Sequence, residues 1–337
     1  MSLDSMSEIM LPKIEDELKR AVSLTDSEGY GELYNMLAYH LGWIGAGSGA
    51  KARGKRIRPL MLLLTTSAAG GDWKAALPAA AAIELIHNFS LIHDDIEDDS
   101  PLRRGRQTLW KKWGLAQAIN AGDAMFSLAH IAIIRLEETT SKLVAFDATK
   151  ILHASCLRLT QGQFLDISYE EDGNLSMDAY WPMVEGKTAA LLSASTEIGA
   201  IVAQSNNQTR KAFKEFGKLL GLAFQTKDDL LGIWGNAALT GKSAASDLTS
   251  GKKSLPVLYG LSLKGAFSNR WAEGPIFPDE VSDIARQLEY EGAREYTQNI
   301  SDDLTRKALL ALAEVVPKND ARITLEELAD QLLKRQQ

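Results

Sequence analysis

The most acidic stretch of this 337-residue chain is Asp94-Asp95-Ile96-Glu97-Asp98-Asp99, called here the first acidic segment. If it is helical, Asp94 and Asp98 share one face, four residues apart, where like charges weaken a bare helix. No lysine or arginine inside the segment offsets them. A solvated helix end is the plain alternative. Carboxylates one turn apart also suit Mg²⁺, which binds one or two of them and keeps places for water or phosphate, so a cation is expected here.

A second acidic pair, Asp228-Asp229, lies in the apolar stretch Phe224 to Leu231 and is called here the second acidic segment. Paired acids in a helix are common, so the pair alone is weak evidence. Helical bundles build metal sites from side chains on facing helices. We therefore expect the two acidic segments to face each other across a bundle core.

Basic residues alternate with these acids along the chain. Arg103-Arg104-Gly105-Arg106 follows the first acidic segment closely, and others lie in a glycine-rich loop or beside glycines and helix breaks: Lys51, Arg53, Lys55, Arg56, Arg58, Lys187, Lys242, Lys252 and Lys253. A run of charge is usually a solvated face. A metal held by carboxylates next to guanidinium groups, however, is the arrangement that binds a diphosphate. The sequence predicts such a site.

Three other chemistries fit less well. Thr240-Gly241-Lys242-Ser243 resembles the end of a P-loop, but Gly235 is one residue too far upstream and no strand precedes it. Glu84 and His87 have the Glu-x-x-His spacing of di-iron bundles, which need a second copy that this chain lacks. The glycines before Lys51 are not accompanied by the aromatic residues that bind single-stranded nucleic acid.

The elements that must position these residues are helices. Apolar residues recur at three and four positions, so we predict an all-α chain. The expected helices are Met6 to Leu24, Leu33 to Leu41, Trp73 to Asp99, Leu115 to Glu138, Leu143 to Tyr169, Met177 to Ser205, Gln208 to Trp234, Leu255 to Leu263, Pro278 to Glu291, Ala293 to Val316 and Ile323 to Leu333. The expected breaks are Gly45 to Gly54, Pro101 to Gly105, Gly235 to Gly251 and Ala266 to Pro278.

Composition limits the class of protein. With 45% hydrophobic residues the chain is not disordered, and we predict one helical domain over residues 1–337, with the motifs between about 50 and 260. A net charge of −7 argues against a nucleic-acid partner. The lone Cys156 excludes an internal disulfide, and the apolar run Ala75 to Ile83 includes Pro78 and ends before Glu84. We expect a cytoplasmic protein with no transmembrane segment.

In order along the chain, these residues resemble the trans-type polyprenyl diphosphate synthases of the isoprenoid synthase superfamily. The resemblance rests on Gly54-Lys55-Arg56-Ile57-Arg58-Pro59, Glu84 to Asp98 with Arg103-Arg104-Gly105, Gly162-Gln163-Phe164-Leu165-Asp166, Gly186-Lys187-Thr188, Phe224 to Asp229, and Gly241-Lys242 with Asp247-Leu248 and Gly251-Lys252. Each piece is modest evidence, but six in order are strong evidence.

The resemblance implies a helical bundle, usually a homodimer, that elongates an allylic diphosphate with isopentenyl diphosphate using three Mg²⁺ ions, or Mn²⁺ in their place. It implies that Asp94 and Asp98 bind two metals with support from Asp95, and that Asp228 binds the third. The same resemblance assigns the allylic diphosphate to Arg103, Lys187, Lys242 and Lys252, isopentenyl diphosphate to Lys55, Arg58, His87 and Arg104, and stabilisation of the developing carbocation to Thr188 and Gln225.

Two positions refine these expectations. The family's second acidic motif often ends in a third aspartate, and this chain has Gly232 there. Phe89 lies five residues before Asp94, about 7.5 Å along a helix, where a growing product would meet it. With Ser90 beside it, we expect a C20 product, with C15 next.

A class I terpene cyclase and a non-catalytic subunit of a prenyl synthase are the alternatives. A terpene cyclase should lack the isopentenyl diphosphate site, for which this chain has Lys55, Arg58 and His87. A non-catalytic subunit loses its acidic motifs, and this chain keeps both largely intact.

Overall fold

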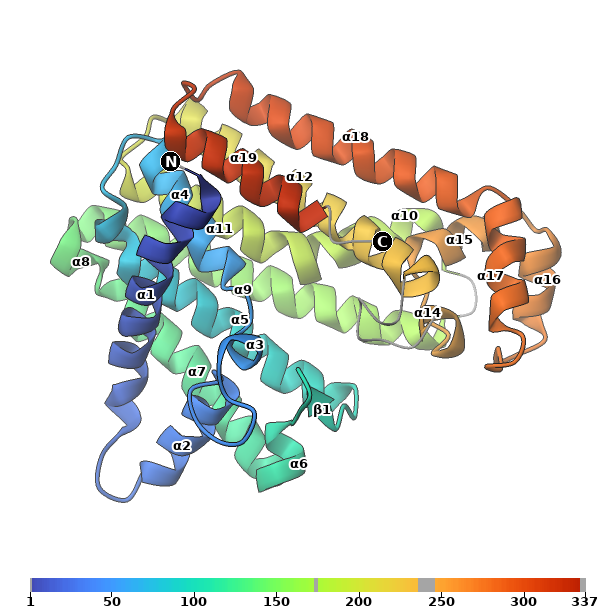
Figure 1. The fold of residues 1–337 in the computed structure, drawn as a ribbon, viewed down its shortest axis with the longest axis horizontal. Helices are drawn as coiled ribbons and strands as arrows, with labels where there is room; N and C mark the ends of the chain where they lie inside the picture. Colours follow the sequence, from blue (N-terminus) through green and yellow to red (C-terminus); the bar gives the residue numbers. More distant parts are fainter. Residues whose placement is uncertain (1, 173–174, 236–245, 334–337) are drawn as a thin grey trace. The chain divides into compact units, whose positions relative to one another are not determined.

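The computed structural model describes residues 2–172, 175–235 and 246–333, and its fold is all-α, as predicted (Figure 1). Up to the middle of the chain, its elements are α1 (Leu3–Val22), η1 (Ser23–Thr25), α2 (Gly31–His40), α3 (Ala50–Arg53), α4 (Ile57–Ala68), η2 (Trp73–Ala76), α5 (Leu77–Glu97), β1 (Leu102–Arg103), β2 (Arg106–Gln107), α6 (Leu109–Trp113), α7 (Leu115–Ile134), α8 (Leu136–Thr139) and α9 (Lys142–Glu171). The remaining elements are α10 (Met177–Val184), η3 (Glu185–Ala189), α11 (Ala190–Val202), α12 (Asn207–Trp234), α14 (Ser246–Thr249), α15 (Leu255–Ser262), α16 (Ala266–Ala272), α17 (Val281–Tyr290), α18 (Ala293–Ala313) and α19 (Asp320–Leu333).

The chain forms two compact units. The first consists of Met1–His153, Ser195–Arg210 and Val316–Leu325, and the second of Ala154–Ala194, Lys211–Val315 and Glu326–Gln337. The single domain over residues 1–337 stays a prediction, as does the expectation that the two acidic segments face each other.

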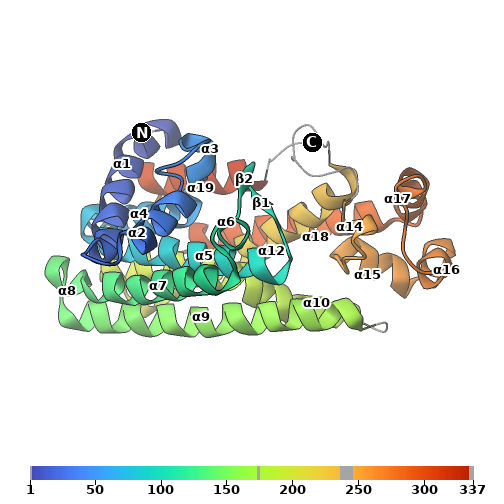
Figure 2. The ribbon, with the colours of Figure 1, turned by 90° about the horizontal axis from the view of Figure 1, so that it is seen from below.

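In the first unit, α5 packs along α7, and these helices appear side by side in Figure 2. Small side chains allow this close approach, because Ala79, Ala80, Ala81 and Ala82 at the start of α5 are fully buried. Helix α4 also lies in this core, and Pro59 to Thr66 are all buried. The C-terminal end of α5, which carries the first acidic segment, is thereby held against a rigid neighbour.

In the second unit, α10, α12, α15 and α18 share a core. Tyr180, Leu222, Leu255 and Leu258 are buried together there, with Leu304 packed against them. A further cluster around Phe267 joins α16 and α17 to the ends of α12 and α15. These contacts fix α12, which carries the second acidic segment.

Most expected helices are confirmed with ends shifted by a few residues. The helix expected over Trp73 to Asp99 is one of them: after η2, α5 runs unbroken through Pro78 and Glu84, because a proline in the first turn has no intrahelical partner to lose. Other expectations are wrong. Helix α16 lies in a stretch expected to break, and α4 was not expected at all. The helix expected over Met177 to Ser205 is divided by η3, a π-helical turn.

Two segments, Trp73–Glu97 and Leu115–Thr139, are long and apolar enough to cross a membrane on length and composition alone. In their most apolar windows, 72% and 44% of the residues are buried, and a core helix of a soluble protein passes the same test. The absence of a transmembrane segment therefore stays a prediction.

Candidate active site

The first acidic segment lies where α5 ends, as predicted. The helix stops at Glu97, and Asp98 caps it with its backbone N–H donated to the Asp94 carbonyl at 2.9 Å. Asp94 is half-buried, Asp98 is exposed and Asp95 is buried. Asp94 and Asp98 thus lie one turn apart at an accessible helix end, where a hydrated cation can reach both carboxylates.

Asp95 tests whether this helix end suits a cation. Its Oδ1 accepts a hydrogen bond from Arg103 Nε at 2.8 Å, whereas Oδ2 is buried without a hydrogen-bond partner. Burial raises the pKa of this carboxyl to about 6, against the opposing effect of Arg103. A nearby divalent cation would stabilise the charged form of this buried carboxylate and would give Oδ2 an electrostatic partner. In the described part of the chain, no three His, Cys, Asp or Glu residues form a metal-binding group.

A short hairpin places the arginines beside this helix end. β1 and β2 pair antiparallel with Arg103 opposite Arg106, and both residues of the connecting turn, Arg104 and Gly105, have positive φ, as a type I′ turn requires. Arg104 donates to the Ala52 carbonyl at 2.8 Å. A Cβ at Gly54 would lie 2.6 Å from the same guanidinium, so only glycine fits beside it. The hairpin and the loop before α4 therefore meet at Arg104.

Two residues predicted to bind isopentenyl diphosphate, Arg58 and His87, are in direct contact. Arg58 NH1 lies 3.3 Å from His87 Nε2, and since arginine only donates, this nitrogen accepts and the imidazole proton is on Nδ1. Burial, reinforced by Arg58 and Arg104, lowers the pKa of His87 well below its usual value. His87 is therefore a neutral hydrogen-bond donor rather than a second cation. Lys55, predicted for the same substrate, is exposed at the end of the loop.

Arg56, in the same basic loop, has a structural role. Its guanidinium is buried and contacts Glu15 at 2.8 Å, Glu84 at 2.8 Å and the Leu41 carbonyl at 3.1 Å. Because all three partners are protein groups, this arginine holds the loop rather than a ligand. The same network accounts for the buried carboxylate of Glu84.

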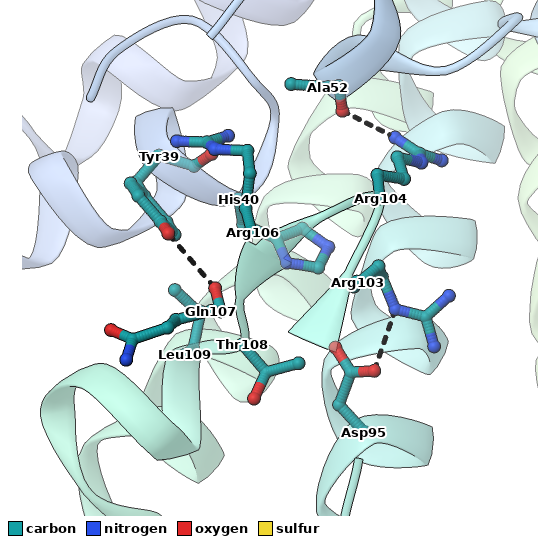
Figure 3. Close-up of a pocket in the computed structure, with 10 residues that line it drawn as sticks. All are labelled: Tyr39, His40, Ala52, Asp95, Arg103, Arg104, Arg106, Gln107, Thr108 and Leu109. Carbon is teal, nitrogen blue, oxygen red and sulfur yellow. Dashed lines mark hydrogen bonds and ion pairs between the residues drawn. The ribbon is translucent and has the colours of Figure 1, made fainter. Parts of the chain in front are cut away.

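Figure 3 shows a pocket behind the arginines that includes a residue the sequence analysis missed. His40, at the end of α2, lines it with Arg103, Arg104 and Arg106, and Asp95 closes one side. Burial, followed by the charges of Arg103 and Arg104, lowers the pKa of His40 to about 3. His40 precedes Leu41 and is far from any recognised motif, so only the fold brings it here.

Phe89, the predicted chain-length residue, has aromatic neighbours. Its ring centroid lies 4.8 Å from that of His93 and 5.1 Å from that of Phe126 on α7. A Cβ at Gly122 would lie 2.2 Å from His93 Nε2, so glycine makes room for the His93 ring. Ser90 is buried and donates to the His87 carbonyl at 2.9 Å. Phe89 is thus held between two rings.

In the second unit, Lys187 lies on the π-helical turn η3 and forms an ion pair with Asp166 of α9. The two backbones touch: a Cβ at Gly162 would lie 2.1 Å from the Lys187 nitrogen, and one at Gly186 would lie 2.6 Å from the Arg158 carbonyl oxygen. Two glycines on facing elements are therefore what place Lys187 beside Asp166.

The residues predicted to stabilise a carbocation are connected by hydrogen bonds. The Thr188 hydroxyl donates to Gln225 Oε1 at 2.7 Å, and Gln225 Nε2 donates to Asp229 Oδ1 at 3.0 Å. Asp229 Oδ2 accepts from the Tyr180 hydroxyl at 2.7 Å and from the Leu255 backbone N–H at 3.0 Å. Asp229 is therefore a structural anchor, which leaves Asp228 as the half-buried acid of this segment.

Lys252, predicted as a helper for the allylic diphosphate, is surrounded by acids. Burial works against its ammonium, but Asp229, Asp247, Asp228 and Asp166 outweigh it and raise the pKa. Lys252 therefore stays charged. Lys242, predicted for the same diphosphate, lies outside the described residues.

Within each unit, most predicted residues come together. Asp94, Asp95, Asp98 and Arg103 lie at the end of α5, Arg58 meets His87, and Lys187, Thr188, Gln225, Asp228 and Lys252 lie around Asp229. The sequence analysis missed His40 and Tyr180, and gave Asp166 and Asp247 no role. Asp166 and Asp247 could have been found, because both lie in motifs on which the family resemblance rests.

Comparison with known proteins identifies the family. A family model described as polyprenyl synthetase matches residues 47–273. A geranylgeranyl diphosphate synthase of Mycobacterium tuberculosis is 38% identical over 304 residues, covering 88% of this chain and 85% of the relative. A (2E,6E)-farnesyl diphosphate synthase of the same species is 36% identical over 315 residues, covering 89% and 86%.

A solved structure, a polyprenyl synthetase from Streptomyces coelicolor A3(2), is 35% identical with a TM-score of 0.88, and the match covers 98% of this chain and 100% of that one. The helical fold, the acidic helix end and the arginine hairpin therefore occur in a chain that matches this family along most of its length. The chain belongs to the polyprenyl synthetase family.

Proposed function

We propose that this enzyme is a magnesium-dependent, chain-elongating prenyltransferase that condenses isopentenyl diphosphate with an allylic diphosphate and releases diphosphate. The observation that carries the proposal is the end of α5, where Asp94 and Asp98 lie one turn apart and Asp95 is bonded to an arginine of the adjacent hairpin. Relatives named as farnesyl and geranylgeranyl diphosphate synthases support the reaction class.

In this proposal Asp94, Asp98 and Asp228 hold three Mg²⁺ ions, with Mn²⁺ as a substitute. Bound magnesium would neutralise charge that grows on the departing diphosphate as its C–O bond breaks. Arg103 fits this role because Asp95 binds only one nitrogen, Nε, leaving the rest of the guanidinium fork for phosphate oxygens. Lys187, Lys242 and Lys252 complete the allylic diphosphate site.

Lys55, Arg58, Arg104 and the neutral His87 hold isopentenyl diphosphate in this proposal. The double bond of that substrate attacks the allylic carbocation, and the adduct then loses a proton to the released diphosphate, so no protein nucleophile is needed. Thr188 and Gln225 present oxygen lone pairs to the cation. The hydrogen bond from Thr188 to Gln225 fixes both oxygens in advance, so they need not reorganise as charge develops.

We propose a C20 product, with C15 next, because Phe89 is the bulky residue below Asp94 and Ser90 leaves room beside it. We also propose that the enzyme is a homodimer of the cytoplasm with no nucleic-acid partner. The buried, free thiol of Cys156 supports the cytoplasmic location, and the net charge of −7 supports the absence of a nucleic-acid partner.

The test is incubation of the full-length protein with isopentenyl diphosphate and each of dimethylallyl, geranyl and farnesyl diphosphate, with Mg²⁺ varied and products sized by chromatography. We expect Mg²⁺-dependent elongation to C20. Asp98→Ala should lower turnover by about 100-fold or more, because it removes a carboxylate ligand of a metal ion that would neutralise the charge developing on the diphosphate. Asp283→Asn, at an exposed acid of α17, is the matched control and should leave turnover unchanged.

Cyclic hydrocarbons made without isopentenyl diphosphate would instead identify a terpene cyclase. No elongation at any Mg²⁺ concentration by a folded protein would rule out the catalytic assignment.

A further inference from the structure

Arg56 has an unusual backbone conformation and lies between two residues proposed to bind isopentenyl diphosphate. It precedes the first residue of α4 and has φ 47° and ψ 40°, in the left-handed region. Lys55 comes one residue before it and Arg58 two residues after it. A residue other than glycine keeps this conformation only where its surroundings hold it. The side-chain contacts of Arg56 therefore help to set the path of the chain from Lys55 to Arg58.

The Arg56 guanidinium is held from three sides, all within the first unit. Its Nε donates to Glu15 Oε1 of α1 at 2.8 Å, and its NH1 donates to Glu84 Oε1 of α5 at 2.8 Å. Its NH2 donates to the Leu41 carbonyl at 3.1 Å. Because the side chain is only 2% exposed and the guanidinium fork is planar, these partners fix one orientation of Arg56.

Two neighbouring contacts connect the start of α4 with α5. Arg56 binds Glu84, and two residues later Arg58 NH1 lies 3.3 Å from Nε2 of His87, which is three residues after Glu84. Glu84 is held on its own helix, since its Oε1 also accepts from Asn88 Nδ2 at 2.9 Å. The buried contact between Arg56 and Glu84 therefore helps to align the contact between Arg58 and His87.

Glu15 is the charged partner of Arg56 that lies outside the motifs of the family resemblance. It follows the buried Ile14 on α1, and its side chain is 13% exposed. Both of its oxygens are bound, because Oε1 accepts from Arg56 and Oε2 accepts from Trp43 Nε1 at 2.6 Å. A carboxylate accepts at both ends, whereas an amide of the same size accepts at only one. The arrangement therefore requires glutamate rather than glutamine here.

We propose that Glu15 is a positioning residue for isopentenyl diphosphate, which acts through Arg56 on the placement of Lys55 and Arg58. The inference rests on the proposed function for the identity of this substrate. Since both Glu15 oxygens are bound to protein groups, Glu15 acts at a distance from the substrate. The proposed ligands of the allylic diphosphate lie on the arginine hairpin and in the second unit, so Glu15 should affect one substrate more than the other.

The test measures the two substrates separately. Glu15→Gln, Trp43→Phe and Asp16→Asn are made in the full-length protein. The KM for isopentenyl diphosphate, the KM for geranyl diphosphate and kcat are measured with Mg²⁺, and the melting temperature is measured in parallel. Asp16→Asn is the matched control, because it removes the neighbouring acid of α1, whose side chain is 65% exposed and pairs with Lys13 at 3.6 Å.

We expect Glu15→Gln to raise the KM for isopentenyl diphosphate about tenfold, the scale seen when the partner that orients a binding group is lost, with kcat and the other KM within about twofold of wild type. Trp43→Phe frees one Glu15 oxygen but leaves the other on Arg56, so it should raise the same KM less, by about threefold. Asp16→Asn should match the wild type in all four measurements.

An unchanged KM for isopentenyl diphosphate in folded Glu15→Gln would overturn the proposal. Equal increases in both KM values with a lower melting temperature would also overturn it, because Glu15 would then support the fold in general. If Glu15→Gln does not fold, an unchanged KM for isopentenyl diphosphate in Trp43→Phe would be the overturning result. Failure of the proposed function is distinct, since the wild type itself would then not elongate prenyl chains.

Discussion

His40 and His87 are neutral although each lies among arginines. Burial is the larger cause in both cases, and the arginine charges add to it. A neutral imidazole beside guanidinium groups adds a directional donor without adding repulsion between cations. In the proposed isopentenyl diphosphate site, His87 would therefore contribute a directional hydrogen bond, whereas Arg58 and Arg104 would contribute charge.

The low pKa of His40 predicts acid sensitivity. Below the usual histidine pKa of about 6.5, the unfolded chain binds a proton that the folded protein refuses, so stability falls as the pH drops. Between pH 7.5 and 5.0 this should cost the wild type up to about 2 kcal/mol for His40. Urea unfolding of His40→Gln at both pH values should show that much less loss. Equal pH dependence in variant and wild type would contradict the assignment.

Phe89 predicts product length. Phe89→Ala removes a ring held between His93 and Phe126, so it should give a growing chain more room and make the main product longer than that of the wild type. Phe126→Ala removes only one support of that ring and should give a smaller shift. Chromatography of the extracted products is the measurement, and an unchanged length in Phe89→Ala would remove it as the cavity floor.

Among the elements, η3 shows how a local irregularity serves the site. The five-residue π-helical turn carries Gly186, Lys187 and Thr188, so two predicted site residues and the glycine before them leave the regular helical path together. Such turns are frequent at functional sites because they redirect side chains at little cost to the helix. Here the turn is pressed against Gly162 of α9.

Gly162→Ala tests this contact. Its Cβ would lie 2.1 Å from the Lys187 nitrogen, so η3 must move away from α9. We expect a loss of stability of about 1–3 kcal/mol, as for other overpacked sites, and a higher KM for the allylic diphosphate. Gly31→Ala is the matched control, since a Cβ there meets nothing within 4 Å. Wild-type stability and KM in Gly162→Ala would disprove the contact.

On the scale of the whole molecule, α9 presents a stripe of exposed apolar side chains. Leu143, Phe146, Leu157 and Phe164 are 71%, 62%, 61% and 69% exposed. Leu143 and Phe146 belong to the first unit, and Leu157 and Phe164, which are seven residues apart on one helix face, belong to the second. Exposed apolar surface of this kind marks an interface. It supports a second copy of this chain as the partner.

The proposed homodimer can be tested directly. Phe146→Asp combined with Leu157→Asp places two charges in the stripe, so we expect light scattering after size exclusion to report a monomer. Tyr290→Asp, at an 87% exposed aromatic residue of α17, should stay dimeric. A wild-type chain that is monomeric at micromolar concentration, or a double variant of wild-type mass, would reject this interface.

A structural feature could be predicted from the sequence when neighbouring residues determine it, and could not when contacts between distant residues do. Amphipathic helices such as α12 are predictable because their apolar residues recur every three or four positions. Helix α4 was missed because residues 59–66 are all buried, so few polar residues in this apolar stretch mark a solvent face. The acids, Lys187 and Arg103 were found through short motifs. The roles of His40, Tyr180 and Glu15 depend on contacts between distant residues, which no local pattern encodes.

The buried guanidinium of Arg56 sets a limit on how this enzyme can be shortened. The family-matched region begins at residue 47, yet Arg56 inside it is held by Glu15 and by the Leu41 carbonyl, both upstream. A fragment trimmed to the matched region would leave a buried cation with Glu84 as its one remaining carboxylate partner from this network. The amino-terminal helix is thus part of the minimal folding unit, and expression designs based on the family-matched region should retain it.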